Sequence, residues 1–277
     1  MSLVIDPRLA KYGLATFQGF FGYSGAEVRG GHPSRNVSRF ELGPYRGFLK
    51  RQCWIPWKDY VLSWWAGFGF VDRSRREWNT LVALRRRGIP CPEPLAVGTH
   101  NGQSFLLLRE LEGSIDLTTY LVECKPAPSE LRLLARKLAG LLARLHGAGF
   151  THPDLYAKHV FVHRDDLTLA LIDFQRTAWH RRVPWRKRWR DLAALDASLG
   201  QQLVSENYRQ YFLACYLRAA RAPQLAGRAV RAIRRRSDYL LRRRKVRAMR
   251  HPWQVVSGTQ QIEYVRVSFD PISRASG

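Results

Sequence analysis

The chain has 277 residues, of which 45% are hydrophobic, so it can bury a sizeable core in one large domain or in two lobes. Its 46 basic residues against 22 acidic ones give a formal net charge of +24, which predicts a polyanionic partner such as nucleic acid, anionic lipid or a phosphorylated glycan. Four widely spaced cysteines without a CxxC motif exclude a disulfide framework and a zinc site, and fit a reducing compartment.

The first clear element is a β-hairpin. Residues 37–42 and 45–50 read as strands on either side of a Gly43-Pro44 turn. Residues 1–25 give only a weak structural signal. They show neither the charged start nor the long apolar run of a signal peptide, so we expect a cytoplasmic protein.

An aromatic segment and a helix follow the hairpin. Four tryptophans crowd this segment, and its longest apolar stretch, residues 61–71, is too short to cross a bilayer. The helix is predicted to begin at Ser74, because Ser74 and Glu77 have the spacing of a capping box. It is predicted to end at Gly88, before a proline.

The second half of the chain is predicted to be mainly helical. From residue 129 to residue 146 the apolar side chains recur at i, i+3, i+4 and i+7, which indicates an amphipathic helix facing a core. Ser129 is its expected cap and Gly147 its expected end. Helical patterns dominate again over residues 189–250, and residues 251–277 read as an irregular or short-strand tail.

This order of elements predicts an α+β fold of two lobes, with strands and one helix first and helices afterwards. Residues 104–110 read as a buried strand that leads into a polar connection near residues 111–116, where the lobes would meet. The expected N-lobe spans residues 1–111, and the helical C-lobe spans residues 112–277.

Two aspartates carry most of the functional signal. Asp154 lies in the run Thr-His-Pro-Asp-Leu-Tyr-Ala-Lys-His, and Asp173 follows the apolar residues 169–172. Phosphoryl transfer needs one acidic group to orient an attacking hydroxyl and another to hold Mg²⁺ against the nucleotide phosphates. We therefore expect Asp154 to act as the base and Asp173 to bind Mg²⁺. The alternative is that each is an ordinary turn residue.

Three residues upstream would complete an ATP site. Lys50 ends the second strand of the hairpin, where a cation can neutralise the α- and β-phosphates, and Glu77 of the following helix would fix its position. Glu110, just before the lobe connection, is also assigned to the nucleotide site. The alternatives are that Lys50 is an ordinary strand-end cation and that Glu77 belongs only to the capping box.

Three further positions are less specific. His159 lies five residues after Asp154, where protein kinases carry a metal-binding asparagine. Imidazole is a poorer ligand for Mg²⁺ than an oxygen, so His159 is interpreted as a metal ligand, as a brace for the loop or a phosphate, or as a structural residue. Gly30 and Gly31 precede the hairpin, where a phosphate-covering loop or an ordinary turn would lie. Arg176 is either a contact for substrate phosphate or a solvated side chain.

With these residues in place, the chain resembles the lipopolysaccharide core heptose kinase family, bacterial sugar kinases with a protein-kinase-like fold. The resemblance covers about residues 37–213. It rests mainly on Arg-Glu-Trp-Asn at 76–79, His-x-Asp-x-Tyr-x-x-His at 152–159, Ile-Asp-x-x-Arg at 172–176 and Trp-Arg-Asp-Leu at 189–192.

The resemblance implies that ATP and Mg²⁺ are the cofactors. It implies that the acceptor is a sugar hydroxyl of the lipopolysaccharide inner core, with heptose as the first candidate. It implies that Asp154 is the catalytic aspartate, that Asp173 is the metal ligand, and that Lys50 and Glu77 are the nucleotide ion pair. Asp191 would tie down the catalytic loop. A protein or small-molecule kinase of the same fold, and a membrane-associated pseudokinase scaffold, are the alternatives.

Two basic segments fit an anionic glycolipid acceptor at the cytoplasmic face of the inner membrane, as the resemblance implies. Residues 181–190 hold six basic residues, and residues 228–250 hold eleven against one acidic residue. A polybasic segment gains roughly 1 kcal/mol per residue near an anionic membrane. The candidate substrate-binding residues of the first segment are Arg182, Arg186, Lys187 and Arg190.

An aromatic cluster would assist at that membrane surface. Its members, which would enter the lipid headgroup zone, are Trp64, Trp65, Phe68 and Phe70. The alternative is that they form a core cluster. Nucleic acid is not expected as a partner, because no recognised nucleic-acid module is present. The sequence indicates no oligomeric state.

Overall fold

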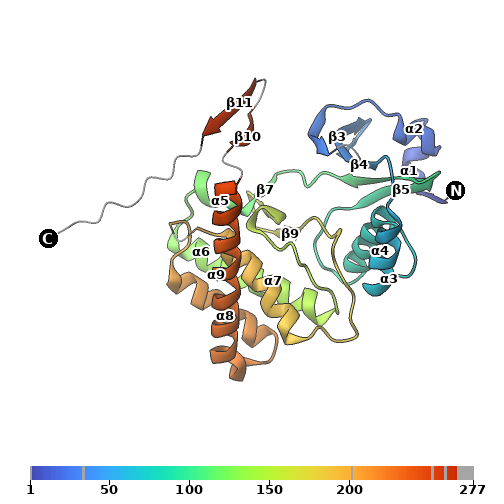
Figure 1. Cartoon of the computed structure of the whole chain (residues 1–277). Coiled ribbons are helices and arrows are strands. Elements are labelled where there is room, and N and C mark those ends of the chain that lie inside the picture. The colour runs from blue at the N-terminus through green and yellow to red at the C-terminus, as the bar shows by residue number, and fades with distance from the viewer. Residues whose placement is uncertain (1, 33–34, 201, 251–252, 259–260, 267–277) are drawn as a thin grey trace.

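The computed structural model describes residues 2–32, 35–200, 202–250, 253–258 and 261–266. A six-stranded antiparallel sheet occupies the first part of the chain, and helices dominate the second part (Figure 1). The fold is α+β and bilobal, as predicted.

The large sheet has the strand order β1-β5-β6-β4-β3-β2. The predicted hairpin is confirmed, with Leu42 opposite Tyr45 and Lys50 opposite Val37. The first strand was missed, and it pairs with β5 so that Ser2 lies opposite Thr99. The strands are β1 (Ser2–Ile5), β2 (Glu27–His32), β3 (Arg35–Leu42), β4 (Tyr45–Gln52), β5 (Pro94–His100) and β6 (Gln103–Arg109).

Two short helices, α1 (Pro7–Ala10) and α2 (Phe17–Phe21), pack on this sheet. Phe20 of α2 stacks on Phe105 of β6, with ring centroids 4.9 Å apart. Residues 1–25, which give only a weak signal in the sequence, therefore contribute to a small buried aromatic core.

Helix α4 (Arg73–Arg86) follows α3 (Trp57–Trp65), and its start differs from the prediction. Asp72, and not Ser74, is the N-cap, and its carboxylate accepts hydrogen bonds from the backbone N–H groups of Ser74 and Arg75. A charged acceptor suits the positive end of a helix. The capping-box interpretation of Glu77 is therefore wrong, and its carboxylate points elsewhere.

The helical part contains the predicted amphipathic helix as α6 (Pro128–Gly147). It begins one residue early, at a proline in the first helical position, and Ala127 rather than Ser129 is its N-cap. Proline suits that position because it has no N–H to leave unpaired. The other α-helices are α5 (Leu117–Glu123), α7 (Trp185–Ser198), α8 (Glu206–Ala219) and α9 (Ala226–Arg250).

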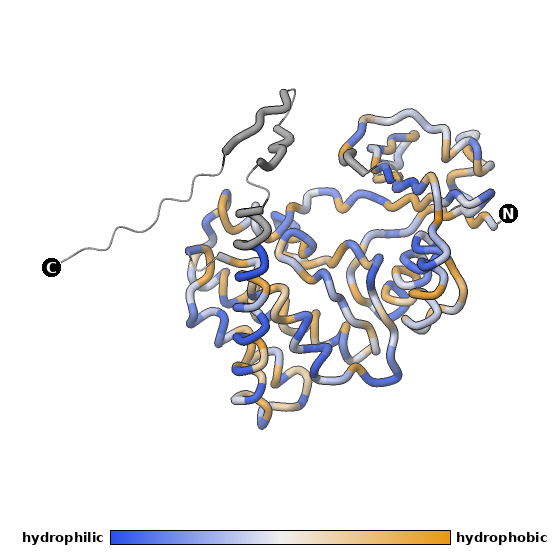
Figure 2. Tube along the Cα trace, in the orientation of Figure 1, coloured by the Kyte–Doolittle hydropathy of each residue, from blue (hydrophilic) through white to orange (hydrophobic). Residues whose placement is uncertain are grey.

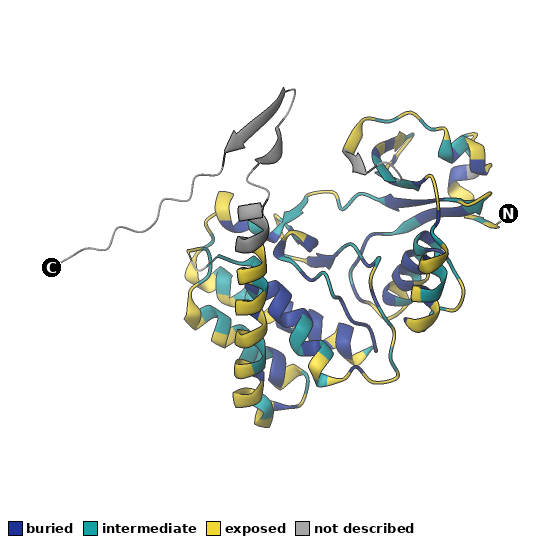
Figure 3. Ribbon diagram, viewed as in Figure 1, coloured by how far each residue is buried: buried dark blue, intermediate teal, exposed yellow. Residues whose placement is uncertain are grey.

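Helix α9 runs along α7, and hydrophilic and hydrophobic residues alternate along it (Figures 1 and 2). Most of its residues from 226 to 244 are exposed, whereas much of α7 is buried (Figure 3). In the described part of the chain, no helix combines the length and the apolar character that crossing a membrane requires.

A second sheet, of β7 (Ser114–Asp116), β8 (Val160–His163) and β9 (Leu169–Leu171), carries the loops that hold both aspartates. The short 3₁₀ helix η1 (Ala157–His159) leads directly into β8. One hydrophobic cluster includes Leu84 of α4 and Leu142 of α6, so it spans both parts of the chain. The lobe boundary after residue 111 stays a prediction.

Beyond α8, the 3₁₀ helix η2 (Pro223–Leu225) leads into α9. The predicted tail contains a hairpin of β10 (Trp253–Gly258) and β11 (Gln261–Arg266). Residues 251–252, 259–260 and 267–277 of that prediction lie outside the described residues.

Candidate active site

The best-defined part of the site is an ion pair between the sheet and α4. Nζ of Lys50 lies 2.7 Å from Oε1 of Glu77, whose residue is only 2% exposed. Burial raises the pKa of Glu77 above its ordinary value, and the ammonium of Lys50 opposes this change. A buried carboxylate of this kind holds the lysine in one position, where it can meet a nucleotide phosphate.

The turn after β9 places Asp173 beside this pair. The charge of Asp173 raises the pKa of Glu77, and the backbone of Phe174 lowers it. Asp173 has a φ of 64°, in the left-handed region that costs most residues energy but that aspartate tolerates. The fold therefore gathers the lysine, the glutamate and the predicted metal ligand in one place.

His159 lies between the predicted base, Asp154, and the predicted metal ligand, Asp173. Its Nδ1 lies 2.7 Å from the carbonyl oxygen of Asp154, and its Nε2 lies 3.6 Å from Oδ2 of Asp173. A carbonyl oxygen can only accept, so Nδ1 carries the proton and donates. In the neutral ring, Nε2 and the Asp173 carboxylate are then two acceptors that face each other, an arrangement that suits a cation between them.

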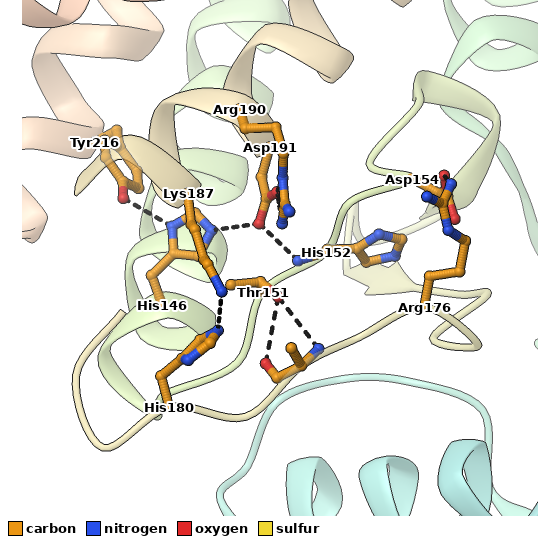
Figure 4. A network of polar contacts seen from close by, with 11 residues as sticks. His146, Thr151, His152, Asp154, Arg176, His180, Lys187, Arg190, Asp191 and Tyr216 are labelled. Atoms are coloured by element: carbon orange, nitrogen blue, oxygen red, sulfur yellow. Dashed lines mark hydrogen bonds and ion pairs between the residues drawn. The ribbon is translucent and has the colours of Figure 1, made fainter. Parts of the chain in front are cut away.

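The carboxylate of Asp154 contacts Arg176. Oδ1 of Asp154 lies 2.8 Å from Nη1 of Arg176, whose side chain is 67% exposed (Figure 4). The exposed arginine and the predicted base thus form one charged unit at the surface of the site. An anionic group arriving from solvent would meet both.

A buried aspartate holds the catalytic loop from behind (Figure 4). Oδ2 of Asp191 accepts a 2.7 Å hydrogen bond from the backbone N–H of His152, and Oδ1 accepts from Arg190. Burial would raise the pKa of Asp191, but His146 and Arg190 lower it below its ordinary value, so the carboxylate stays charged. Asp191 therefore holds down the loop that carries Asp154, as the resemblance implies.

Two members of this network were missed. Nε2 of His146 lies 3.4 Å from Asp191, and its Nδ1 lies 2.7 Å from the hydroxyl of Tyr216 (Figure 4). Both residues come from helices, α6 and α8, that are distant in sequence from the catalytic loop. No local spacing in the sequence indicates such a contact.

The segment after Asp173 is fixed at two residues. Arg76 of α4 donates to the carbonyl oxygen of Thr177, and Thr151 exchanges hydrogen bonds with Ala178. Burial lowers the pKa of Arg76 to about 10. The Arg-Glu-Trp-Asn motif of α4 therefore serves both sides of the site, with Glu77 on the nucleotide side and Arg76 on the segment toward α7.

The basic segment 181–190 divides into outward and inward residues. Arg182 and Arg186 are exposed, as a substrate-binding role requires. Lys187 lies 3.1 Å from Nε2 of His180, and Arg190 is held by Asp191. Arg190 is thus engaged in the bracing network as well as being a predicted acceptor contact.

The other residues predicted to bind nucleotide are Glu110, Gly30 and Gly31, and no contact joins them to the ion pair of Lys50 and Glu77 among the hydrogen bonds and ion pairs described above. The carboxylate of Glu110 forms an ion pair with Arg39, 2.8 Å away. Gly30 and Gly31 lie in β2 rather than in a loop, next to a register irregularity with β3, and residues 33–34 lie outside the described residues.

Arg35, at the start of β3, adds a feature that fits a phosphate. Its Nε is buried and has no hydrogen-bond partner among the described residues. Burial lowers the pKa of Arg35, Arg73 lowers it further, and the charges of Asp59 and Asp173 oppose that change. A buried, unsatisfied guanidinium nitrogen within electrostatic range of Asp173 suits the oxygens of a nucleotide.

The donor set fits Mg²⁺ bound together with ATP. In the described residues no group of three or more His, Cys, Asp or Glu side chains could hold a metal ion. Mg²⁺ in nucleotide sites is bound by one or two carboxylates together with phosphates and water, so Asp173 with His159 beside it is sufficient. A separate apolar cavity of about 370 Å³ among the C-terminal helices is lined by none of these residues.

A paired lysine and glutamate, an aspartate in a braced loop and a second aspartate after a short strand are the arrangement of a protein-kinase-like phosphotransferase. The chain matches the lipopolysaccharide kinase (Kdo/WaaP) family over residues 59–216, more than half of its length. It belongs to this family. The predicted resemblance and the predicted enzyme class, an ATP-dependent phosphotransferase, are confirmed.

Named relatives fall into two groups. The lipopolysaccharide core heptose(I) kinase WaaP of Escherichia coli is 26% identical over 202 residues, which are 65% of this chain and 76% of that protein. The protein of the same name from Pseudomonas aeruginosa is 27% identical, over 66% of this chain and 74% of that protein. The 3-deoxy-D-manno-octulosonic acid kinase of Xylella fastidiosa is 31% identical, over 54% of this chain and 61% of that protein.

Proposed function

We propose that the protein transfers the terminal phosphoryl group of ATP to a sugar hydroxyl of the lipopolysaccharide inner core, with heptose as the first candidate. The observation that carries this proposal is the position of His159, which contacts the backbone of Asp154 and faces the carboxylate of Asp173. The names of the WaaP relatives support the choice of acceptor.

In this proposal each charged residue has one task. Asp154 orients the acceptor hydroxyl and accepts its proton. Lys50, fixed by Glu77, and Arg35 bind the nucleotide phosphates. Asp173, with His159 beside it, would hold Mg²⁺. When bound, Mg²⁺ neutralises charge on the phosphates.

The acceptor side is formed by arginines that face solvent. Arg176 sits next to Asp154, and Arg182 and Arg186 follow on the exposed side of the same segment. Guanidinium groups bind phosphate and carboxylate oxygens in a two-pronged geometry. The inner core carries such groups, so these residues would place the sugar hydroxyl at Asp154.

A second candidate acceptor is 3-deoxy-D-manno-octulosonic acid itself. The relatives with that name share up to 31% identity with the chain, although over a shorter stretch than the WaaP proteins. Both acceptors would use the same catalytic residues. Only the position of the new phosphate separates them.

We further propose that the enzyme works at the cytoplasmic face of the inner membrane as a peripheral protein, because its acceptor is anchored there and its surface is strongly basic. Residues 1–111 would form the nucleotide-binding lobe, and residues 112–277 would form the catalytic and acceptor-binding lobe. The basic helix α9 would contribute to the attraction for anionic lipid.

The test is phosphate transfer from radiolabelled ATP with Mg²⁺ to three acceptors: a core glycolipid that contains heptose, a truncated glycolipid that ends in 3-deoxy-D-manno-octulosonic acid, and a generic protein substrate. We expect label on the first, and Asp154→Ala serves as the matched inactive control. Mass spectrometry of the core from cells that lack the protein would locate the missing phosphate. ATP binding without transfer to either glycolipid would contradict the proposal and favour the scaffold alternative.

A further inference from the structure

Helix α3 has its amphipathic pattern reversed. Its two buried residues are the polar Asp59 and Ser63, whereas Trp57 and Trp65 are 76% and 78% exposed. A helix on a soluble protein normally buries its apolar stripe and exposes its polar face. The reversal leaves several large apolar side chains in water, which marks a surface that contacts something else.

The buried polar face of α3 is what attaches it to the protein. Asp59 forms an ion pair with Arg73 at 3.0 Å and accepts a hydrogen bond from Gln52. The outward orientation of the tryptophans is therefore fixed by polar contacts underneath. Turning the helix to bury its aromatic face would break these contacts.

Three of the exposed aromatic side chains contact one another. Trp64 contacts the rings of both Trp65 and Phe70. At the end of α3, the backbone N–H of Trp179 donates to the carbonyl oxygen of Ala66. We refer to the exposed side chains of this surface as the α3 patch, which consists of Trp57, Leu62, Trp64, Trp65, Phe70 and Trp179.

Phe68 does not belong to the α3 patch, contrary to the prediction that grouped it with its neighbours. Its ring is partly buried and packs under the guanidinium of Arg76, 5.7 Å from the ring centroid. The predicted aromatic cluster thus divides into an inward anchor and an outward surface.

We propose that the α3 patch docks on the surface of an anionic lipid bilayer, with its tryptophans at the level of the headgroups. Tryptophan is the side chain that favours this depth, because its ring is apolar and its N–H is polar. The charges around the patch match an anionic surface: Lys58 on α3, and Arg181 and Arg182 just after Trp179, are exposed, and the one acidic residue of α3 is buried and paired.

The α3 patch lies next to the acceptor side of the site, so a membrane bound at the patch would be close to it. Trp179 belongs to the segment that begins at Asp173 and carries Arg176, and Arg76 fixes that segment at Thr177. A lipid-anchored sugar leaving the bilayer at the patch would therefore meet the exposed arginines first. This inference rests on the proposed function only in taking the acceptor to be lipid-anchored.

The first experiment measures membrane binding without any acceptor. Full-length protein is mixed with vesicles of phosphatidylethanolamine and phosphatidylglycerol, and with vesicles that carry bromine on the acyl chains, which quench inserted tryptophan. We expect Trp64→Ser/Trp65→Ser to lower partitioning about tenfold or more and to remove most of the quenching. The matched control is Val122→Ser/Tyr211→Ser, two exposed apolar residues elsewhere, and it should bind like the wild type.

The second experiment separates this inference from the proposed function. With acceptor embedded in vesicles, the Trp64→Ser/Trp65→Ser variant should lose activity, and with a deacylated, water-soluble acceptor it should keep wild-type activity. Inactivity of the wild type on both acceptors would count against the proposed function but not against vesicle binding. Vesicle binding that does not change in the variant would overturn the inference. Light scattering that shows a dimer lost in the variant, without vesicle binding, would overturn it in favour of a second copy of the chain.

Discussion

Arg176 and Asp154 are joined by an ion pair of 2.8 Å, so a predicted acceptor contact and the predicted base meet directly (Figure 4). Only Nη1 of the arginine is engaged in this bond, and a guanidinium has five N–H donors. The same side chain can therefore hold the base and bind an acceptor phosphate at once. Substrate binding would then arrange the catalytic carboxylate.

Replacing Arg176 should affect turnover of the anionic acceptor and leave stability unchanged. A hydrogen bond to a charged group contributes about 1.5–3 kcal/mol, so Arg176→Gln should lower kcat/KM for the acceptor roughly 10- to 100-fold. An exposed ion pair adds about 0–1 kcal/mol to stability. Steady-state kinetics and thermal melts measure the two effects. Arg164→Gln, which removes another exposed ion pair, is the control and should change neither.

The substitution Asp154→Asn should abolish most phosphate transfer. A positioned general base typically contributes about 10²–10⁴-fold, and asparagine keeps the shape of the side chain without its basicity. The melting temperature should stay close to that of the wild type, because the carboxylate is not part of the core. Turnover near the wild-type rate would show that another group serves as the base.

Removing Lys50 should cost both activity and stability. Lys50→Met leaves the buried Glu77 carboxylate without its ammonium partner, and breaking a buried ion pair on one side costs about 3–5 kcal/mol. The double variant Lys50→Met/Glu77→Leu should recover most of this stability and remain inactive. Urea denaturation with activity assays distinguishes the two effects. A double variant as unstable as the single one would argue against an ion pair that stabilises the fold.

Stability should fall as the pH decreases from 7 toward 5. Burial lowers the pKa of His146 below 6.5, so in this range the unfolded chain takes up a proton that the folded protein does not. His152 and His180 are shifted in the same direction. Melting temperatures measured across this pH range should decline less steeply for His146→Gln than for the wild type. An equal slope in both proteins would contradict a buried, neutral His146.

The sequence predicts those parts of the structure whose determinants are local. The hairpin around Gly43 follows from strand alternation and a turn, and α6 follows from its apolar spacing. The two aspartates are predicted as site residues because each stands next to a short apolar strand with a distinctive loop. These elements are set by contacts within about ten residues.

What the sequence did not predict depends on partners far along the chain. Strand β1 is short and forms only by pairing with β5, and the contact of His146 with Asp191 joins two separate helices. The start of α4 was misplaced because Asp72 and Ser74 are both good caps, and only the folded backbone decides between them. The aromatic residues of α3 resemble a core segment until the polar contacts of Asp59 show which face is inward.

The attachment of α4 also has a consequence for how the enzyme is controlled. Asp72 caps the helix and accepts a hydrogen bond from Thr99, the hydroxyl of Ser74 meets that of Ser104, and Arg76 reaches across to Thr177. Helix α4 is thus hydrogen-bonded to the sheet on one side and to the acceptor segment on the other. These contacts resist the outward movement of a helix by which many signalling kinases are switched off. We therefore expect the pair of Lys50 and Glu77 to stay assembled without a signal, so that turnover depends on the supply of acceptor and nucleotide.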